Sequence, residues 1–207
     1  MPSIDLSFLA EDPSAKTEEA TLTIEALAPL SMNTSVPGKH YQTATEPPLR
    51  QIYGLFENAM GLHFGWRDSY KVRQEIADDA AADVQISGSD KRDFQPLLEP
   101  YYDLTLDEAP TVETFDDTQW AHKWRDSGTI RNGAMHHDWR ATLDKASNYG
   151  YGKTIIEREH VVADGPWIYR LRAAPMAMDA LANALSDPAG QLYLGNNDGW
   201  VDVTLRR

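Results

Sequence analysis

The stretch PGKHYQTATEPPLRQIYGLFENAMGLHF, residues 37–64, runs from a polar loop into a segment with helical periodicity. Its apolar residues repeat at the spacing of one helix face, at Leu49, Ile52, Phe56 and Met60. Thr45 suits the N-cap, the pair Pro47-Pro48 suits the first turn, and Gly61 suits the end of the helix. Gly54 in mid-helix costs about 1 kcal/mol relative to alanine, which predicts close packing against the backbone there.

A hydrophobic strand, residues 21–32, precedes this stretch, and the loop that follows the strand is rich in hydrogen-bond donors. The loop carries Lys39, His40, Tyr41, Thr43 and Thr45. Cationic, aromatic and hydroxyl side chains beside a helix N-terminus are suited to holding a phosphate group or a sugar edge. The alternative, an ordinary loop before a core helix, stays open on these residues alone.

Length and composition limit the class of protein. The 207 residues suffice for one large domain, residues 1–207, with a core of its own. There is no cysteine, which excludes disulfides, a thiol nucleophile and a zinc–thiolate site. No apolar run approaches ~20 residues and the first residues lack a signal-peptide pattern, so we expect a cytoplasmic protein without a membrane span.

The net charge of −13 is unusual for a protein that binds nucleic acid. Either the chain meets no nucleic acid, or an acidic surface surrounds a local basic patch. Aspartate outnumbers glutamate and arginine outnumbers lysine, a composition that suggests a source adapted to salt. The sequence leaves both explanations of the charge open.

Residues 120–140, WAHKWRDSGTIRNGAMHHDWR, reverse this composition and mix cations with flat side chains. The cations are Lys123, Arg125, Arg131 and Arg140, and the flat side chains are Trp120, Trp124, Trp139, His122, His136 and His137. Such a mixture suits unstacked bases and phosphates, although tryptophans that anchor a core would give the same pattern. No metal site is expected at the adjacent histidines, because neighbouring side chains of a strand point to opposite faces. We predict that cations from the loop, the helix and this segment share one side of the fold, namely Lys39, Arg50, Lys123, Arg125 and Arg131.

The rest of the chain alternates strand and helix patterns. Residues 83–118 are predicted to be irregular and acidic. Strands are expected at residues 154–162, 167–172 and 200–205, the first pair forming a hairpin, with a helix at residues 175–185. Without an insertion at residues 65–150, the order is β-α-β-β-α-β. This order predicts an α+β, ferredoxin-like sheet with helices on one face and the other face free for RNA.

Three short stretches, in order along the chain, match the pattern of one known family. The first is the loop and helix, with Thr43 or Thr45, the proline pair, and IYGLFENAMG at residues 52–61. The second is EREHVV, residues 157–162, in which His160 replaces the usual tyrosine. The third is LYLG, residues 192–195, followed by NND where the family has a basic-polar-acidic triplet. Together they resemble the CRISPR-associated Cas-five family, at both ends of the chain more than in its middle.

The resemblance implies a non-catalytic RNA-binding subunit of a type I CRISPR Cascade complex, a member of the RAMP superfamily that caps the 5′ handle of the crRNA in antiviral defence. It implies a thumb-like hairpin within residues 65–150, for which residues 119–150 are candidates. Its partners would be the crRNA, the Cascade backbone and large subunits and, indirectly, target DNA, with no cofactor, metal or membrane. The candidate RNA-contacting residues are Lys39, His40, Tyr41, Thr43, Thr45, Arg50, Lys123, Trp124, Arg125, Arg131, His137 and Arg140.

Other functions stay open. Some members of the family cleave precursor crRNA without a metal, using tyrosine, lysine and histidine, and this chain has Lys39, His40 and Tyr41 together. A general acid–base pair must reach one phosphate within hydrogen-bond distance, which adjacency in sequence does not guarantee. A stand-alone hydrolase would need a motif such as HExxH or a nucleophile elbow, and the sequence has neither. A protein–protein scaffold would lack a cluster of basic and aromatic residues.

Overall fold

The computed structural model covers residues 1–207 and describes most of them. The described ranges are residues 5–10, 12–32, 40–62, 70–75, 95–122, 129–131, 134–136, 153–195 and 198–207. Within these ranges, only the backbone is described for His40 and for residues 119–122, 129–131, 134–136 and 153–156.

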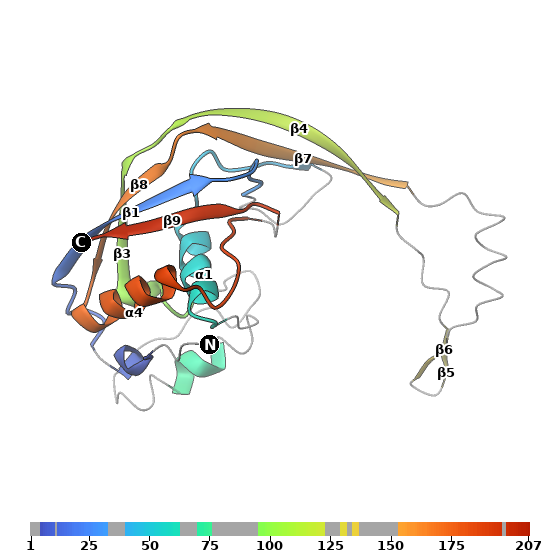
Figure 1. The fold of residues 1–207 in the computed structure, drawn as a ribbon. Helices are drawn as coiled ribbons and strands as arrows, with labels where there is room; N and C mark the ends of the chain where they lie inside the picture. Colours follow the sequence, from blue (N-terminus) through green and yellow to red (C-terminus); the bar gives the residue numbers. More distant parts are fainter. Residues whose placement is uncertain are drawn as a thin grey trace.

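The elements follow one another as short helices and longer strands (Figure 1). The helical elements are η1 (Ser7–Ala10), α1 (Leu49–Ala59), η2 (Glu99–Tyr101) and α4 (Pro175–Ser186), and residues 70–75 are also helical. The strands are β1 (Glu18–Ala26), β2 (His40–Tyr41), β3 (Tyr102–Glu108), β4 (Thr111–His122), β5 (Thr129–Arg131), β6 (Ala134–His136), β7 (Lys153–Asp164), β8 (Trp167–Ala173) and β9 (Val201–Arg206).

Within the described ranges, a four-stranded antiparallel sheet in the order β3-β8-β1-β9 forms the body of the fold. Helices α1 and α4 lie against one face of this sheet (Figure 1). Alternation along the strands explains the placement, because Leu22 and Ile24 of β1 and Trp167 of β8 are fully buried while their neighbours face outward. The sheet and the helices therefore share one apolar core, and the predicted α+β class is confirmed.

The predicted hairpin of residues 154–162 and 167–172 is wrong in its pairing. Both segments are strands, but β7 pairs with β4, and β8 lies between β3 and β1. The position beside β8 is taken by β3, which lies in the stretch predicted to be irregular. Asp103 and Asp107 lie on the exposed face of β3. The acidic residues on this face make the strand hard to recognise in the sequence.

Backbone conformation sets both ends of helix α1. Its N-cap is Pro48, with φ −61° and ψ 135°, so the prediction that Thr45 caps the helix is wrong. Gly61 ends the helix as predicted, with φ 75°. The Leu62 N–H donates to the Glu57 carbonyl at 2.7 Å, as in a Schellman motif.

Gly54 lies in the middle of α1, and the predicted close packing there is wrong. A Cβ atom added to Gly54 would meet no described atom within 4 Å. Alanine would fit this space and would lose less backbone entropy on folding than glycine does. We expect Gly54→Ala to raise the free energy of unfolding by about 0.5–1 kcal/mol in a denaturant titration. A loss of stability would contradict the open surroundings of Gly54.

β4 and β7 leave the body as a long, curved two-stranded arm (Figure 1). Within the described residues, β2 adds to β7 in parallel, which gives the order β2-β7-β4. The turn at residues 164–166 connects β7 to β8, so the arm continues into the central part of the body. Between β4 and β7 along the chain, β5 and β6 pair with each other.

Candidate nucleic-acid interface

The face of the four-stranded sheet opposite α1 and α4 carries ion pairs. Arg170 lies 2.8 Å from Asp107, and Arg172 lies 3.5 Å from Glu19. In the described part of the chain, the exposed large hydrophobic side chains are Leu27, Leu49, Phe115, Val162, Met176 and Trp200. None of these belongs to β1, β3, β8 or β9. This face therefore lacks exposed aromatic rings on which RNA bases stack, and a better candidate lies elsewhere on the fold.

The loop before α1 is joined to the root of the arm by hydrogen bonds around Thr43. Thr43 Oγ1 accepts the Met32 N–H at 2.8 Å, and the Thr43 N–H donates to Glu159 Oε2 at 2.9 Å. Leu30 and Val161 exchange backbone hydrogen bonds of 2.9 and 2.7 Å. Residues 30–32, which follow β1, thus lie between the loop before α1 and strand β7.

The third stretch with family resemblance reaches the same place. A Cβ atom added to Gly195 would lie 2.1 Å from the Ser31 carbonyl oxygen, so residues 192–195 approach the backbone of residues 31–32 directly. The three stretches that carry the resemblance, far apart in sequence, therefore meet around residues 30–32. Their convergence makes this junction the first candidate for a functional site.

Tyr41 and Arg158 form a cation–π contact at this junction. They are register partners in the parallel pairing of β2 with β7. The Arg158 guanidinium carbon lies 5.4 Å from the centroid of the Tyr41 ring, within the range of an attractive cation–π interaction. Arg158 Nε is buried and has no hydrogen-bond partner among the described residues.

Phe115 and His160 form a stacked pair next to this contact. They are opposite each other in the antiparallel pairing of β4 with β7, with ring centroids 5.3 Å apart and an interplanar angle of 15°. Phe115 is 45% exposed, and Val162, two residues beyond His160, is 47% exposed. Because residues two apart on a strand share a face, these side chains lie on the same face as Arg158.

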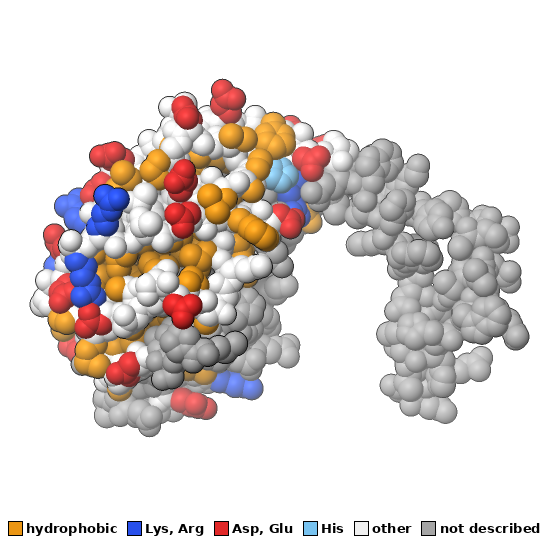
Figure 2. Space-filling view, in the orientation of Figure 1, with side chains coloured by type: hydrophobic (Ala, Val, Ile, Leu, Met, Phe, Trp, Pro, Cys, Tyr) orange, Lys and Arg blue, Asp and Glu red, His pale blue; other side chains and the backbone are white. Residues whose placement is uncertain are grey.

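We name this surface the arm-root face and define it by Tyr41, Phe115, Arg158, His160 and Val162. Hydrophobic side chains gather there beside a histidine and a cation, where the arm leaves the body (Figure 2). Glu113 and Asp117 share this face by register, so the cationic character is local and its surroundings are acidic. Flat rings with a neighbouring guanidinium are typical of surfaces that bind single-stranded nucleic acid.

The structure brings part of the predicted site together. Tyr41 and Thr43 lie at the junction, whereas Thr45 and Arg50 are exposed, Arg50 in the first turn of α1. His40 in β2 and Arg131 in β5 are placed by their backbone only. The other predicted residues lie outside the described residues, namely Lys39, Lys123, Trp124, Arg125, His137 and Arg140. The prediction that the cations share one side therefore stays a prediction.

Sequence reasoning missed Phe115 and Val162, and used Arg158 and His160 only as family markers. Phe115 stands in an acidic stretch with no periodic signal, so only its pairing with His160 gives it a role. The buried, unpartnered Nε of Arg158 is a property of the tertiary structure. Neither the pairing of Phe115 with His160 nor the burial of Arg158 Nε can be predicted from a sequence pattern.

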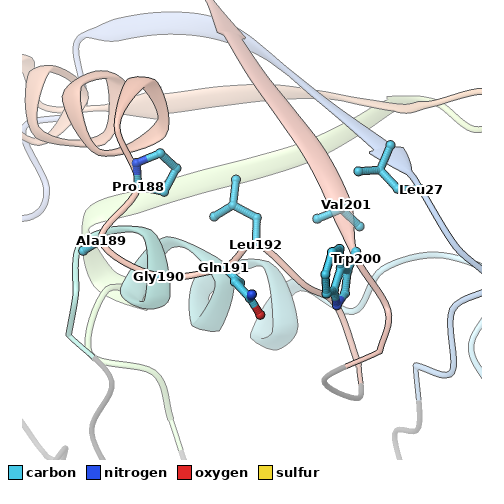
Figure 3. Close-up of a pocket in the computed structure, with 8 residues that line it drawn as sticks. All are labelled: Leu27, Pro188, Ala189, Gly190, Gln191, Leu192, Trp200 and Val201. Atoms are coloured by element: carbon cyan, nitrogen blue, oxygen red, sulfur yellow. The ribbon is translucent and has the colours of Figure 1, made fainter.

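A second exposed apolar region lies between the end of α4 and the start of β9. It forms a shallow groove of about 540 Å³ (Figure 3). Its lining residues are Leu27, Pro188, Ala189, Gly190, Gln191, Leu192, Trp200 and Val201. Among the described residues, no Lys or Arg side chain contributes to this lining, so this part of the groove offers no cation to a phosphate.

Among the described residues, no group of three or more His, Cys, Asp or Glu side chains is placed to hold a metal ion. Of the helices that the structure describes, none combines the length and the apolar character needed to cross a bilayer.

These features define an α+β domain with a projecting two-stranded arm and an aromatic, cationic face at the root of that arm. The sequence matches the family described as "CRISPR-associated protein Cas5p" over residues 4–150. The chain belongs to this family. No curated protein matches the sequence.

A chain from a "CRISPR RNA-guided surveillance complex" aligns with a TM-score of 0.48 and 16% sequence identity. The alignment covers 88% of the present chain and 60% of that chain. The present chain thus spans less than two thirds of the length of that chain.

Proposed function

We propose that this chain is a non-catalytic, RNA-binding subunit of a type I CRISPR Cascade surveillance complex, and that it caps the 5′ handle of the crRNA in antiviral defence. The observation that carries the proposal is the arm-root face, on which Phe115, His160 and Arg158 lie beside the loop residue Tyr41. Family membership gives this face its context, because the family is CRISPR-associated.

The proposal also includes a ferredoxin-like fold with a thumb. With β2 and β4 to β7 set aside, the order β1, α1, β3, β8, α4, β9 and the sheet order β3-β8-β1-β9 fit a single ferredoxin-like domain, residues 1–207. Within the predicted insertion, residues 65–150, β3 belongs to the body. We therefore assign the thumb to the part of the chain that begins with β4. The thumb would contact the Cascade backbone and large subunits, and target DNA would be met indirectly.

The net charge of −13 is compatible with this role. A subunit held by protein neighbours and by a bound guide needs cations only where the guide lies. Nucleic-acid affinity depends on local phosphate contacts and on salt, so an acidic outer surface lowers nonspecific binding without preventing a specific contact.

The experiment is a pull-down of the tagged chain from its own host, with sequencing of the RNA that copurifies. We expect short guides that share one 5′ repeat fragment, together with several partner proteins. The control is the same host without the tag, and a nuclease-treated sample shows which partners stay through protein contacts. If neither RNA nor partner proteins copurify, the proposal is contradicted, and the scaffold and hydrolase alternatives have to be considered again.

The endoribonuclease alternative has one observation in its favour. Tyr41 and His160 flank Arg158 on the same face, so a phenol, an imidazole and a guanidinium are close to one another. The purified assembly, incubated with precursor crRNA and EDTA, tests it directly. Cleavage that is lost in Tyr41→Phe would establish a metal-independent nuclease, and an intact precursor would support the non-catalytic role.

A further inference from the structure

The most exposed aromatic ring of the arm-root face is that of Phe115. Phe115 is 45% exposed, and among the described residues only His160 stacks on it. One side of the phenyl ring is covered by the imidazole, at an interplanar angle of 15°, and the ring remains accessible beyond it. A stacked pair holds the ring in one orientation, which lowers the entropy lost when a further flat group stacks on it.

We infer that Phe115, supported by His160, is the stacking platform for one unstacked base of single-stranded RNA, and that Arg158 contacts a phosphate of the same strand. This inference rests on the proposed RNA-binding function and names the place where one nucleotide binds. Base–aromatic stacking accepts any base, so the site would add affinity without reading sequence.

The distance between the two contacts fits one nucleotide. Phe115 is opposite His160, and Arg158 is two residues from His160 on β7, so Phe115 and Arg158 are diagonal neighbours about 7–8 Å apart across the two strands. This span is comparable to that between a base and the phosphate of its own nucleotide. Arg158 is held by the Tyr41 ring at 5.4 Å, so its guanidinium is oriented before any ligand arrives.

Charge and geometry favour RNA at this face over the other exposed regions. Two arginines on the outer face of the main sheet are paired with carboxylates, Arg170 with Asp107 at 2.8 Å and Arg172 with Glu19 at 3.5 Å. The groove beside Trp200 is lined without Lys or Arg. In the described part of the chain, only the arm-root face joins an exposed ring to an arginine held by a cation–π contact, with Asp117 opposite Arg158 in the strand register.

The test measures binding of the purified full-length chain to two fluorescent probes, an oligouridine RNA and an abasic oligomer of the same length. We expect Phe115→Ala to weaken oligouridine binding roughly tenfold and to leave abasic binding unchanged. Phe115→Trp should restore the wild-type affinity. Leu27→Ala, which truncates a side chain that is 63% exposed in the groove, is the matched control and should bind as the wild type does.

Arg158→Gln should weaken both probes and lower the slope of log affinity against log salt by about 1. Equal affinity of Phe115→Ala and wild type would overturn the inference, as would equal losses on the two probes. If Phe115→Ala keeps its RNA but loses a protein partner in the host pull-down, the face is a protein-docking surface and the inference is also wrong. A wild-type chain that binds neither probe would overturn this site and the proposed RNA-binding function together.

Discussion

Gly195→Ala is expected to destabilise the fold by about 3 kcal/mol or more. Two effects add at this position. Gly195 has φ 77°, a left-handed conformation that side chains with a Cβ rarely adopt. A Cβ atom there would also lie 2.1 Å from the Ser31 oxygen and 2.8 Å from the Ser31 carbon, which are backbone atoms that cannot rotate away. The two segments would have to separate, and their separation would disturb the junction around Thr43.

Thermal unfolding measures this loss, with an expected fall in Tm of roughly 10 °C for a chain of this size. Gly165→Ala is the matched control, since Gly165 has φ 125° but its added Cβ would meet only Pro110 Cβ, at 3.7 Å. It should therefore lose less stability than Gly195→Ala, because only the backbone conformation is strained. Equal losses in the two variants would mean that residues 192–195 do not lie against residues 31–32.

The elements of this fold were predictable where one side of an element is apolar and the other polar. α1 and α4 follow their helical periodicity, and β8 and β9 follow their alternation, with boundaries close to those predicted. Periodicity is a local property, however, and does not name the partner of a strand. The turn after Asp164 favours a hairpin of β7 with β8, but β7 finds its register partners in β4. β3 was missed because its exposed face is acidic, which resembles a solvated loop.

The site was predictable in its loop and not on its arm. Tyr41 and Thr43 were recognised because hydroxyl, aromatic and cationic residues cluster before a helix. Phe115 and Arg158 are separated by 42 intervening residues, and their common face exists only once β4 and β7 pair. A sequence shows which side chains can stack or bind a phosphate, whereas the pairing of distant strands decides which of them meet.

The second large effect concerns Glu57, a buried carboxyl group on α1 that the periodicity analysis did not single out. It is 5% exposed, and its Oε1 accepts the Leu98 N–H at 3.2 Å. Burial raises the pKa of Glu57 from 4.5 to about 7, although the Leu97 and Leu98 N–H groups and the charge of Arg73 act in the opposite direction. Glu57 therefore ties residues 97–98 to α1 and is neutral over part of the acidic range.

The sign of the pH dependence follows from this raised pKa. Between pH 4.5 and about 7, the folded protein keeps a proton on Glu57 that the unfolded chain has released. The free energy of unfolding contributed by this group must then fall as the pH rises through that window, and it stays level above it. The shift corresponds to about 3 kcal/mol, which is a large share of the stability of an ordinary domain.

Glu57→Gln is expected to remove this dependence, because the amide stays neutral and its oxygen still accepts the Leu98 N–H. At pH 8 the variant should be more stable than the wild type by about 2–3 kcal/mol, and at pH 4 the two should be nearly equal. Denaturant titrations across this range measure the difference, with Glu25→Gln on the exposed face of β1 as the matched control. If the wild type and Glu57→Gln differ by the same amount at every pH, the pKa of Glu57 is the same in the folded and the unfolded chain, and burial does not raise it.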